Sequence, residues 1–274
     1  FAGRRLGGLP SALSAWCTKL PGVSPSTYRP CPCAARVVSR SGTVTSTRAA
    51  DGWLAGVMRA IEAVHAGGPE VLTLVDRPAP TAGRGQVVVD VAYAGVNFID
   101  TYRRSGIYPV PFPHVPGSEG AGVVSAVGPD VTDVAVGDRV AWVDGPGSYA
   151  EQVVVAADRT VPVPDGVRLA TAAALMLQGL TAHYLADSSH PVGPGEDVLV
   201  HAGAGGVGLL LTQLAVARGA RVVTTVSTDL KAELSREAGA TAVVRYDQLA
   251  DLTTQLPAAV RAVALPWHQR PEQR

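Results

Sequence analysis

A glycine-rich turn between a buried strand and an apolar helix constrains the fold more than any other feature of this sequence. Residues 196–215 read EDVLVHAGAGGVGLLLTQLA, with glycines in the spacing G-x-G-x-x-G. In a dinucleotide-binding fold such glycines permit a tight turn, let the backbone approach a pyrophosphate, and let the helix pack closely on the strand. The positive end of the helix dipole also favours phosphates. We therefore predict phosphate binding by Gly203, Gly205, Gly206, Val207 and Gly208; the alternative is a glycine-rich turn in another kind of α/β protein.

Strand and helix patterns alternate throughout the region after this turn. Residues 197–202, 221–226 and 242–245 are expected as strands, and residues 207–218 and 229–237 as helices. This βαβαβ order is typical of a doubly wound parallel sheet. The predicted fold class of this half is therefore α/β, with a Rossmann sheet.

The end of the second strand indicates which dinucleotide is bound. An NAD site places an acid there, about 20 residues after the glycines, to hold the ribose 2′-hydroxyl. Here Ser227 and Thr228 occupy that place, and Lys231, the single lysine after Met58, stands within reach of a 2′-phosphate. NADPH is therefore predicted over NADH. Two alternatives stay open: Asp229 caps the helix or binds the hydroxyl itself, and Lys231 is a solvated charge paired with an acid of its own helix.

The region from Met58 to Pro164 has a different pattern. Short Val-rich segments are separated by clusters of Gly, Pro and Asp, which predicts a small antiparallel β domain or open barrel. A short helix is expected at 97–104, and an Ala- and Leu-rich helix at 168–187 connects the two domains. The expected domains are therefore 58–165 and 166–263.

Residues 1–57 differ in composition from the rest. They carry seven basic residues, one acid and all three cysteines, Cys17, Cys31 and Cys33, with no sustained apolar period. We expect a disordered leader, either an organellar transit peptide or, as we favour, upstream sequence translated in frame before Met58. The close pair Cys31 and Cys33 lacks the second ligand pair of a zinc site. The lack of cysteine after Met58 fits a reducing compartment, so a cytoplasmic location is expected.

The charge balance argues against a polymeric partner. Lys plus Arg and Asp plus Glu each number 23, so no overall charge is available to hold a nucleic acid or a membrane surface. No uncharged apolar run approaches the roughly 20 residues that cross a bilayer, so no transmembrane helix is predicted. The expected partner is a small molecule.

Six segments after Met58 together carry a family resemblance. They are AGVNFIDTYRRSGIYP (94–109), PGSEGAGVVSAVG (116–128), VGDRVAW (136–142), SYAEQVVV (148–155), LQGLTAHYL (177–185) and HAGAGGVG (201–208). In this order they resemble the zinc-free quinone oxidoreductases of the medium-chain dehydrogenase/reductase superfamily, the group that includes zeta-crystallin. The resemblance implies an N-terminal GroES-like (chaperonin-10-like) catalytic domain, a Rossmann cofactor domain and an active site between them.

Zinc-dependent members of this superfamily differ at two positions. They read C-G-x-C-x-x-D where this chain has residues 94–100, and G-H-E where it has residues 117–119. The thiolate ligand is thus replaced by Asn97 and the imidazole ligand by Ser118. Because an amide and a hydroxyl are poor zinc ligands, no catalytic metal is expected.

The resemblance also implies individual site residues. Asn97, Tyr102 and Tyr108 correspond to the substrate side, where they orient carbonyl oxygens, although Asn97 can equally be a helix N-cap and the tyrosines simple packing. Residues that border the cofactor are Gln178, Thr181 and, near the 2′-phosphate, Tyr246. Asp100 and Glu119 are assigned to turns and local hydrogen bonds.

The predicted function is NADPH-dependent reduction of a quinone by hydride transfer without a metal. The first alternative is an NADPH-dependent reductase of enones or enoyl thioesters. Family members continue through three further strands that supply the nicotinamide site and the usual homodimer edge, whereas homologous sequence fades here after about Val263 and residues 264–274 read as an unrelated tail. A non-catalytic, cofactor-binding fragment is therefore the second alternative, and a full-length parent is expected to be a homodimer.

Overall fold

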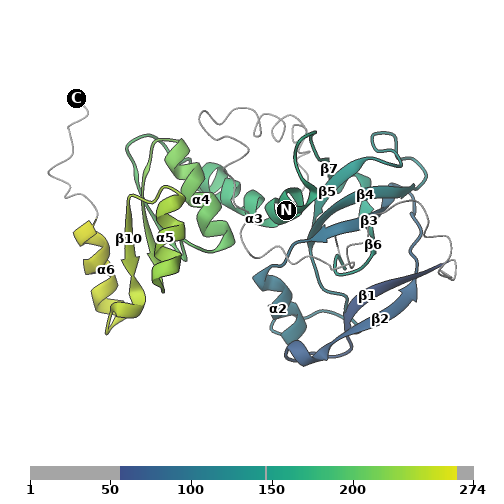
Figure 1. Cartoon of the computed structure of the whole chain (residues 1–274), viewed down its shortest axis with the longest axis horizontal. Helices are drawn as coiled ribbons and strands as arrows, with labels where there is room; N and C mark the ends of the chain where they lie inside the picture. Colours follow the sequence, from purple (N-terminus) through teal and green to yellow (C-terminus); the bar gives the residue numbers. More distant parts are fainter. Residues whose placement is uncertain (1–55, 146, 264–274) are drawn as a thin grey trace. The chain divides into compact units, whose positions relative to one another are not determined.

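A computed structural model describes residues 56–145 and 147–263 of the chain (Figure 1). The chain divides into two compact units between Leu177 and Gln178, within helix α3 (Leu169–His183). The predictions for the leader up to residue 55, with its three cysteines, and for the tail 264–274 lie outside the described residues.

The first unit is built from antiparallel strands. Strands β1 (Val57–Ala63) and β2 (Leu72–Pro78) form a hairpin across the 3₁₀ turn η1 (Pro69–Val71). A second sheet has the order β6-β3-β4-β5-β7. Its strands are β3 (Gln86–Ala94), β4 (Glu119–Val127), β5 (Arg139–Val143), β6 (Gln152–Ala156) and β7 (Thr160–Pro162), the last following the 3₁₀ turn η2 (Ala157–Arg159). The predicted antiparallel β domain is confirmed.

The two faces of the five-stranded sheet bury different clusters. Because side chains alternate along a strand, Val140 and Trp142 of β5 face one side and Ala141 faces the other. The first side collects the valines of β3, β4 and β6, and the second packs against Ala173 and Met176 of α3. This alternation explains why a Val-rich, glycine-punctuated sequence folds into a sheet with a helix on one face.

Helix α2 (Phe98–Ser105) follows β3 closely in the chain, as the sequence predicts. Asn97 is its N-cap, with extended backbone, and Gly106 ends it in the left-handed region at φ 82°. A non-glycine residue is strained at that angle, which explains where the helix stops.

Helix α3 and the π-helical segment η3 (Tyr184–Ser189) form a continuous run, Leu169–Ser189, that is long and apolar enough to cross a membrane. Length and composition are the only grounds for that reading. Ala173 and Met176 are instead buried against the sheet residues Ala121 and Ala141. These two residues therefore pack as core residues do.

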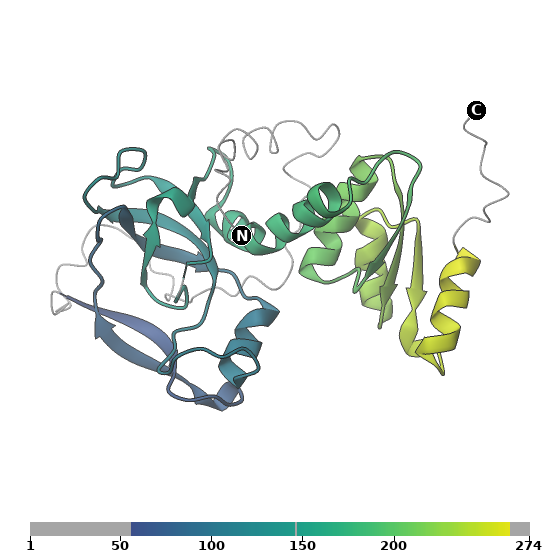
Figure 2. The same cartoon turned by 180° about the vertical axis from the view of Figure 1, so that it is seen from behind.

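The second unit contains a parallel sheet of order β10-β9-β8 (Figures 1 and 2). Its strands are β8 (Asp197–His201), β9 (Arg221–Val226) and β10 (Ala242–Arg245), and its helices are α4 (Gly206–Ala217), α5 (Asp229–Glu237) and α6 (Leu252–Val263), with the 3₁₀ turn η4 (Tyr246–Gln248) after β10. The predicted βαβαβ order is confirmed. Helix α6 was not predicted, because its interior Pro257 disfavours a helix by sequence.

Buried hydroxyl groups tie the parallel sheet to its helices. The Thr224 hydroxyl of β9 and the Ser235 hydroxyl of α5 are 2.6 Å apart and buried. The His201 ring bonds the Thr225 hydroxyl at 3.0 Å, so this histidine pairs within the sheet. The buried hydroxyls among these groups, those of Thr224, Thr225 and Ser235, each have a partner, as buried groups require.

Candidate functional site

A buried carboxylate in the first unit, that of Glu119, connects strand β4 to the start of α2 and to α3 through hydrogen bonds. Glu119, the first residue of β4, is fully buried and accepts hydrogen bonds from the Asn97 side-chain nitrogen and from the Leu177 backbone nitrogen, both at 2.6 Å. Burial raises the pKa of the Glu119 carboxyl, and the two donors oppose that shift. A side chain at Gly95 would meet this carboxylate at 2.1 Å, which explains the glycine there.

Asn97 makes hydrogen bonds both to Glu119 and within the first turn of α2. Its backbone N–H donates to the Asp100 carboxylate at 3.0 Å, and its side chain donates to Glu119. Asn97 is therefore the N-cap of α2, as considered from sequence, and its side chain also holds Glu119. Since one amide hydrogen is held by Glu119, the orientation of the Asn97 carboxamide is fixed.

The sequence-based assignment of two acids needs one correction. Asp100 does bond locally, to Asn97, and it also accepts a hydrogen bond from the distant Tyr149 hydroxyl. Assigning Glu119 to a local turn was wrong, because its partners lie 22 residues earlier and 58 residues later in the chain. The available signal was an acid flanked by small residues at the start of an apolar strand, with Gly95 opposite.

Asp100 also connects to a half-buried phenol. The Tyr149 hydroxyl donates to the Asp100 carboxylate at 3.0 Å. Burial, together with the adjacent Asp100 charge, raises the pKa of Tyr149 far above its ordinary value, so this phenol stays protonated and donates.

The position that holds an imidazole ligand in zinc-dependent relatives is occupied differently here. The Ser118 hydroxyl accepts a hydrogen bond from the Arg103 guanidinium at 2.5 Å and lies 3.5 Å from the Asp100 carboxylate. An amide at residue 97, a hydroxyl at residue 118 and a guanidinium beside it do not fit a zinc ligand set. Within 56–145 and 147–263, no three His, Cys, Asp or Glu side chains gather as a metal site would require.

The two tyrosines expected at the substrate side meet each other at the end of α2. The Tyr102 ring centroid lies 5.2 Å from that of Phe98 and 5.4 Å from that of Tyr108. Tyr108 is half exposed. The aromatic packing considered from sequence is thus present, and it holds both phenols on one helix end.

The glycine turn of the second unit is shaped by close packing. A side chain at Gly208 would lie 2.3 Å from the Ala202 carbonyl oxygen, and one at Gly203 would lie 2.4 Å from the Thr224 Cβ. The tight turn assigned to Gly203 is instead made by Ala202, which adopts φ 53°. Gly203 is therefore needed for space beside β9, and Gly208 for contact between helix and turn.

The start of α4 presents backbone amides. Gly205 is the N-cap of α4, and its carbonyl oxygen accepts the first intrahelical hydrogen bond, from the Leu209 amide at 2.8 Å. The amides of residues 206–208 precede that bond and have no acceptor within the helix. The Gln178 carboxamide of α3 packs against Gly206. A Cβ added at Gly206 would lie 1.7 Å from the Gln178 side-chain oxygen. Thr181 lies about one helical turn further along α3.

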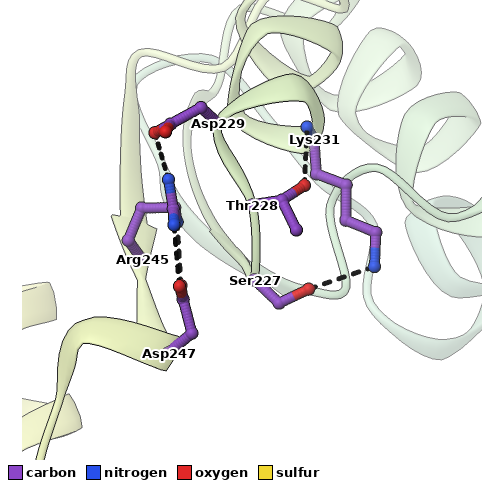
Figure 3. A network of polar contacts seen from close by, with 6 residues as sticks. All are labelled: Ser227, Thr228, Asp229, Lys231, Arg245 and Asp247. Atoms are coloured by element: carbon purple, nitrogen blue, oxygen red, sulfur yellow. Dashed lines mark hydrogen bonds and ion pairs between the residues drawn. The ribbon is translucent and has the colours of Figure 1, made fainter.

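The predicted cation, Lys231 of α5, reaches the residue that follows β9. The Lys231 ammonium donates to the Ser227 hydroxyl at 3.0 Å, and the Lys231 amide donates to the Thr228 hydroxyl at 3.2 Å (Figure 3). Thr228 is thus the N-cap of α5, whereas Asp229 was the cap considered from sequence. Both residue types cap helices well, so sequence alone did not separate them.

An arginine at this edge was missed by sequence reasoning. Arg245, the last residue of β10, donates from Nε and Nη2 to the Asp247 carboxylate at 2.8 and 2.7 Å, and from Nη1 to Asp229. The hydrogen bonds to Asp247 raise the pKa of Arg245 and lower that of Asp247. Tyr246 follows and is half-buried. The signal was the position of Arg245, at a strand end beside the proposed phosphate site.

Two family models and many known proteins match this chain. The alcohol dehydrogenase GroES-like domain matches residues 83–165, and the zinc-binding dehydrogenase domain matches residues 206–264. A quinone oxidoreductase from Pseudomonas aeruginosa is 48% identical over 182 residues, covering 66% of this chain and 56% of the relative. The chain belongs to the medium-chain dehydrogenase/reductase superfamily. Within that superfamily it belongs with the quinone oxidoreductases, as the resemblance implied.

Two further relatives of this superfamily member bear on its chemistry. A mycobacterial protein solved in complex with NADPH is 51% identical, with a TM-score of 0.72, and the match covers 75% of this chain and 63% of that one. A 2-haloacrylate reductase from a Burkholderia species is 42% identical over 191 residues, covering 66% of this chain and 56% of that relative. The chain therefore spans a little over half the length of the curated relatives it matches.

Proposed function

We propose that this superfamily member binds NADPH and takes part in metal-free reduction of a quinone. The observation that carries the proposal is the Lys231 ammonium on the Ser227 hydroxyl, 3.0 Å apart, at the strand end where an NAD site holds an acid. The P. aeruginosa quinone oxidoreductase and the NADPH-bound mycobacterial structure support the same reading.

The second unit supplies the cofactor-binding groups of this proposal. The amides at the start of α4 and the positive end of its dipole bind the pyrophosphate, and Gly208 keeps that helix end against the turn. Lys231 and Ser227 hold the 2′-phosphate through charge-assisted and neutral hydrogen bonds. Gln178, Thr181, Thr228 and Tyr246 complete the proposed cofactor residues.

The first unit supplies the groups proposed to orient the acceptor. NADPH, when bound, supplies a hydride from C4 of its nicotinamide ring. The Asn97 amide, held by Glu119, and the Tyr102 and Tyr108 phenols donate hydrogen bonds to the acceptor oxygens as negative charge develops there. A proton from water or a hydroxyl then completes the hydroquinone. Because the donor set does not fit zinc, the acceptor must already be electrophilic, as a quinone is.

The test is NADPH oxidation by 1,4-benzoquinone, measured beside the thermal unfolding of the same protein with and without NADPH. Turnover together with protection by NADPH is the expected result. Protection without turnover would leave the second alternative, a protein that binds the cofactor only, and a stronger protection by NADH would overturn the cofactor assignment.

One other acceptor class is favoured by a specific observation. The 2-haloacrylate reductase relative is named for a substrate with an activated double bond. Turnover of 2-chloroacrylate or an enone faster than of benzoquinone would move the proposal to that class, which the sequence kept as its first alternative. A cytoplasmic location and a homodimeric full-length protein belong to the same proposal.

A further inference from the structure

The end of the parallel sheet holds a charge pair that the proposed NADPH site does not use. The register of β10 on β9 pairs Arg245 with Val226, so the two strand ends lie level and Ser227 follows beside them. Arg245 bonds Asp247 through two nitrogens and Asp229 through the third. Figure 3 shows the Asp229 carboxylate turned toward Arg245, while the Lys231 ammonium reaches Ser227.

Asp229 is the residue that argues against NADPH. It lies two positions beyond Ser227, at the start of α5, and its side chain is 91% exposed. A carboxylate near this strand end is the group that accepts the ribose 2′-hydroxyl of NAD. It also repels a phosphate within a Debye length of about 8–10 Å. Left unpaired, Asp229 would therefore favour the unphosphorylated dinucleotide.

Arg245 counters both effects. Its guanidinium neutralises Asp229, and the hydrogen bond draws the carboxylate toward β10. The Arg245 side chain is itself held in place. Its Nε and Nη2 atoms donate hydrogen bonds to the Asp247 carboxylate, and only 17% of the side chain is exposed. Because Asp247 holds the guanidinium through Nε and Nη2, the remaining nitrogen, Nη1, can restrain Asp229.

We propose that Arg245 is a specificity-determining residue that secures the preference for a 2′-phosphorylated dinucleotide by neutralising and restraining Asp229. This inference rests on the proposed function, because it concerns the same phosphate site. Arg245 acts here through Asp229 and is a positioning residue. Because the Asp229 side chain is 91% exposed, the Arg245–Asp229 ion pair itself contributes little to folding, and its loss is expected to act on selectivity.

The test compares dissociation constants for NADPH and NADH, measured by calorimetry on the full chain, across a double-mutant cycle. Arg245→Ala is expected to lower the NADPH-over-NADH ratio about tenfold, since a released carboxylate repels the phosphate. Asp229→Asn in the Arg245→Ala background is expected to restore the ratio, because the carboxylate at residue 229 that Arg245 restrains is then gone. Arg221→Ala is the control: Arg221 bonds Asp197 at 2.7 Å, at the opposite end of β9, and its loss is expected to leave the ratio unchanged.

The outcomes separate this inference from the proposed function. A parent chain that prefers NADPH, with an unchanged ratio in Arg245→Ala, would overturn the role of Arg245 alone. A double variant as impaired as Arg245→Ala would also overturn it, because the arginine would then act on the phosphate directly. A parent chain that binds both dinucleotides equally would overturn the proposed cofactor and this inference with it.

Discussion

The Asn97 side chain and the Glu119 carboxylate are joined by a 2.6 Å hydrogen bond that links the start of α2 to the start of β4. In the superfamily pattern, residue 97 holds a cysteine ligand when zinc is present. Here the same position donates to a buried acid. The pair therefore replaces metal coordination with a hydrogen bond that fixes the amide.

Replacing Asn97 with Ala is expected to destabilise the first unit by about 2 kcal/mol. The change removes an N-cap, worth about 1 kcal/mol, and leaves the buried Glu119 with one donor fewer. Urea denaturation measures the loss. Asn97→Ser, which restores a capping hydroxyl without the reach to Glu119, is expected to lose about half as much. Equal stabilities of the parent and Asn97→Ala would refute the structural role.

Glu119→Gln is expected to change how stability depends on pH. The folded-state pKa of Glu119 is raised above its ordinary value of 4.5, so the folded protein holds a proton that the unfolded chain releases. This contribution is fully present below pH 4.5 and is lost as pH rises through the folded-state pKa. The stability advantage of the parent over Glu119→Gln should therefore shrink with rising pH, by up to about 1.4 kcal/mol for each unit of pKa difference.

Denaturation of both proteins at a series of pH values between 4 and 8 (roughly the stable range) checks this sign. An advantage of the parent that grows with pH would mean that the two hydrogen bonds to Glu119 outweigh its burial.

Gly208→Ala is expected to destabilise the second unit by about 1–3 kcal/mol and to weaken NADPH binding. The added Cβ would stand 2.3 Å from the backbone oxygen of Ala202, which cannot rotate away, so α4 must shift off the turn. Gly205→Ala is the matched comparison, because its Cβ would lie 3.2 Å from the same oxygen. Urea midpoints with and without NADPH measure both effects, and equal losses in the two variants would contradict this packing argument.

Lys231→Met is expected to weaken NADPH binding about 10–100-fold and to leave NADH binding nearly unchanged, since a charge-assisted hydrogen bond is worth about 1.5–3 kcal/mol. Arg236→Met, which removes a cation from the last turn of the same helix, is the control for general charge. Calorimetric titration with both dinucleotides is the measurement. Equal weakening of NADPH by the two variants would show that long-range charge, and not the Lys231 site, governs affinity.

The elements of the fold were readable from sequence because their signals are local. Val-rich segments bounded by Gly, Pro and Asp predicted the strands of the first unit, and the glycine spacing from Gly203 to Gly208 predicted the crossover from β8 to α4. Where the signal was weak, prediction failed: Pro257 obscured α6, and the three-residue β7 is too short to show a period.

The site was less readable, because its decisive contacts are distant in sequence. Glu119 was misassigned since its partners are set by the sheet and by α3, not by neighbours. The Arg245–Asp229 pair depends on the register of β10 on β9, which no local pattern reveals. The Lys231–Ser227 pair was closer to prediction, because both residues lie within the first turn of α5 or just before it.

In the glycine turn of the second unit, residue 202 is expected to tolerate substitution and residue 208 is not. Ala202 holds an L-residue at φ 53°, where glycine would sit without steric cost, so Gly is expected to be accepted at 202 in a randomised library. At 208 the Ala202 carbonyl excludes anything larger than hydrogen. Deep sequencing of the functional variants in such a library should therefore recover both Ala and Gly at residue 202 but only Gly at residue 208, although the two residues lie only one short turn apart.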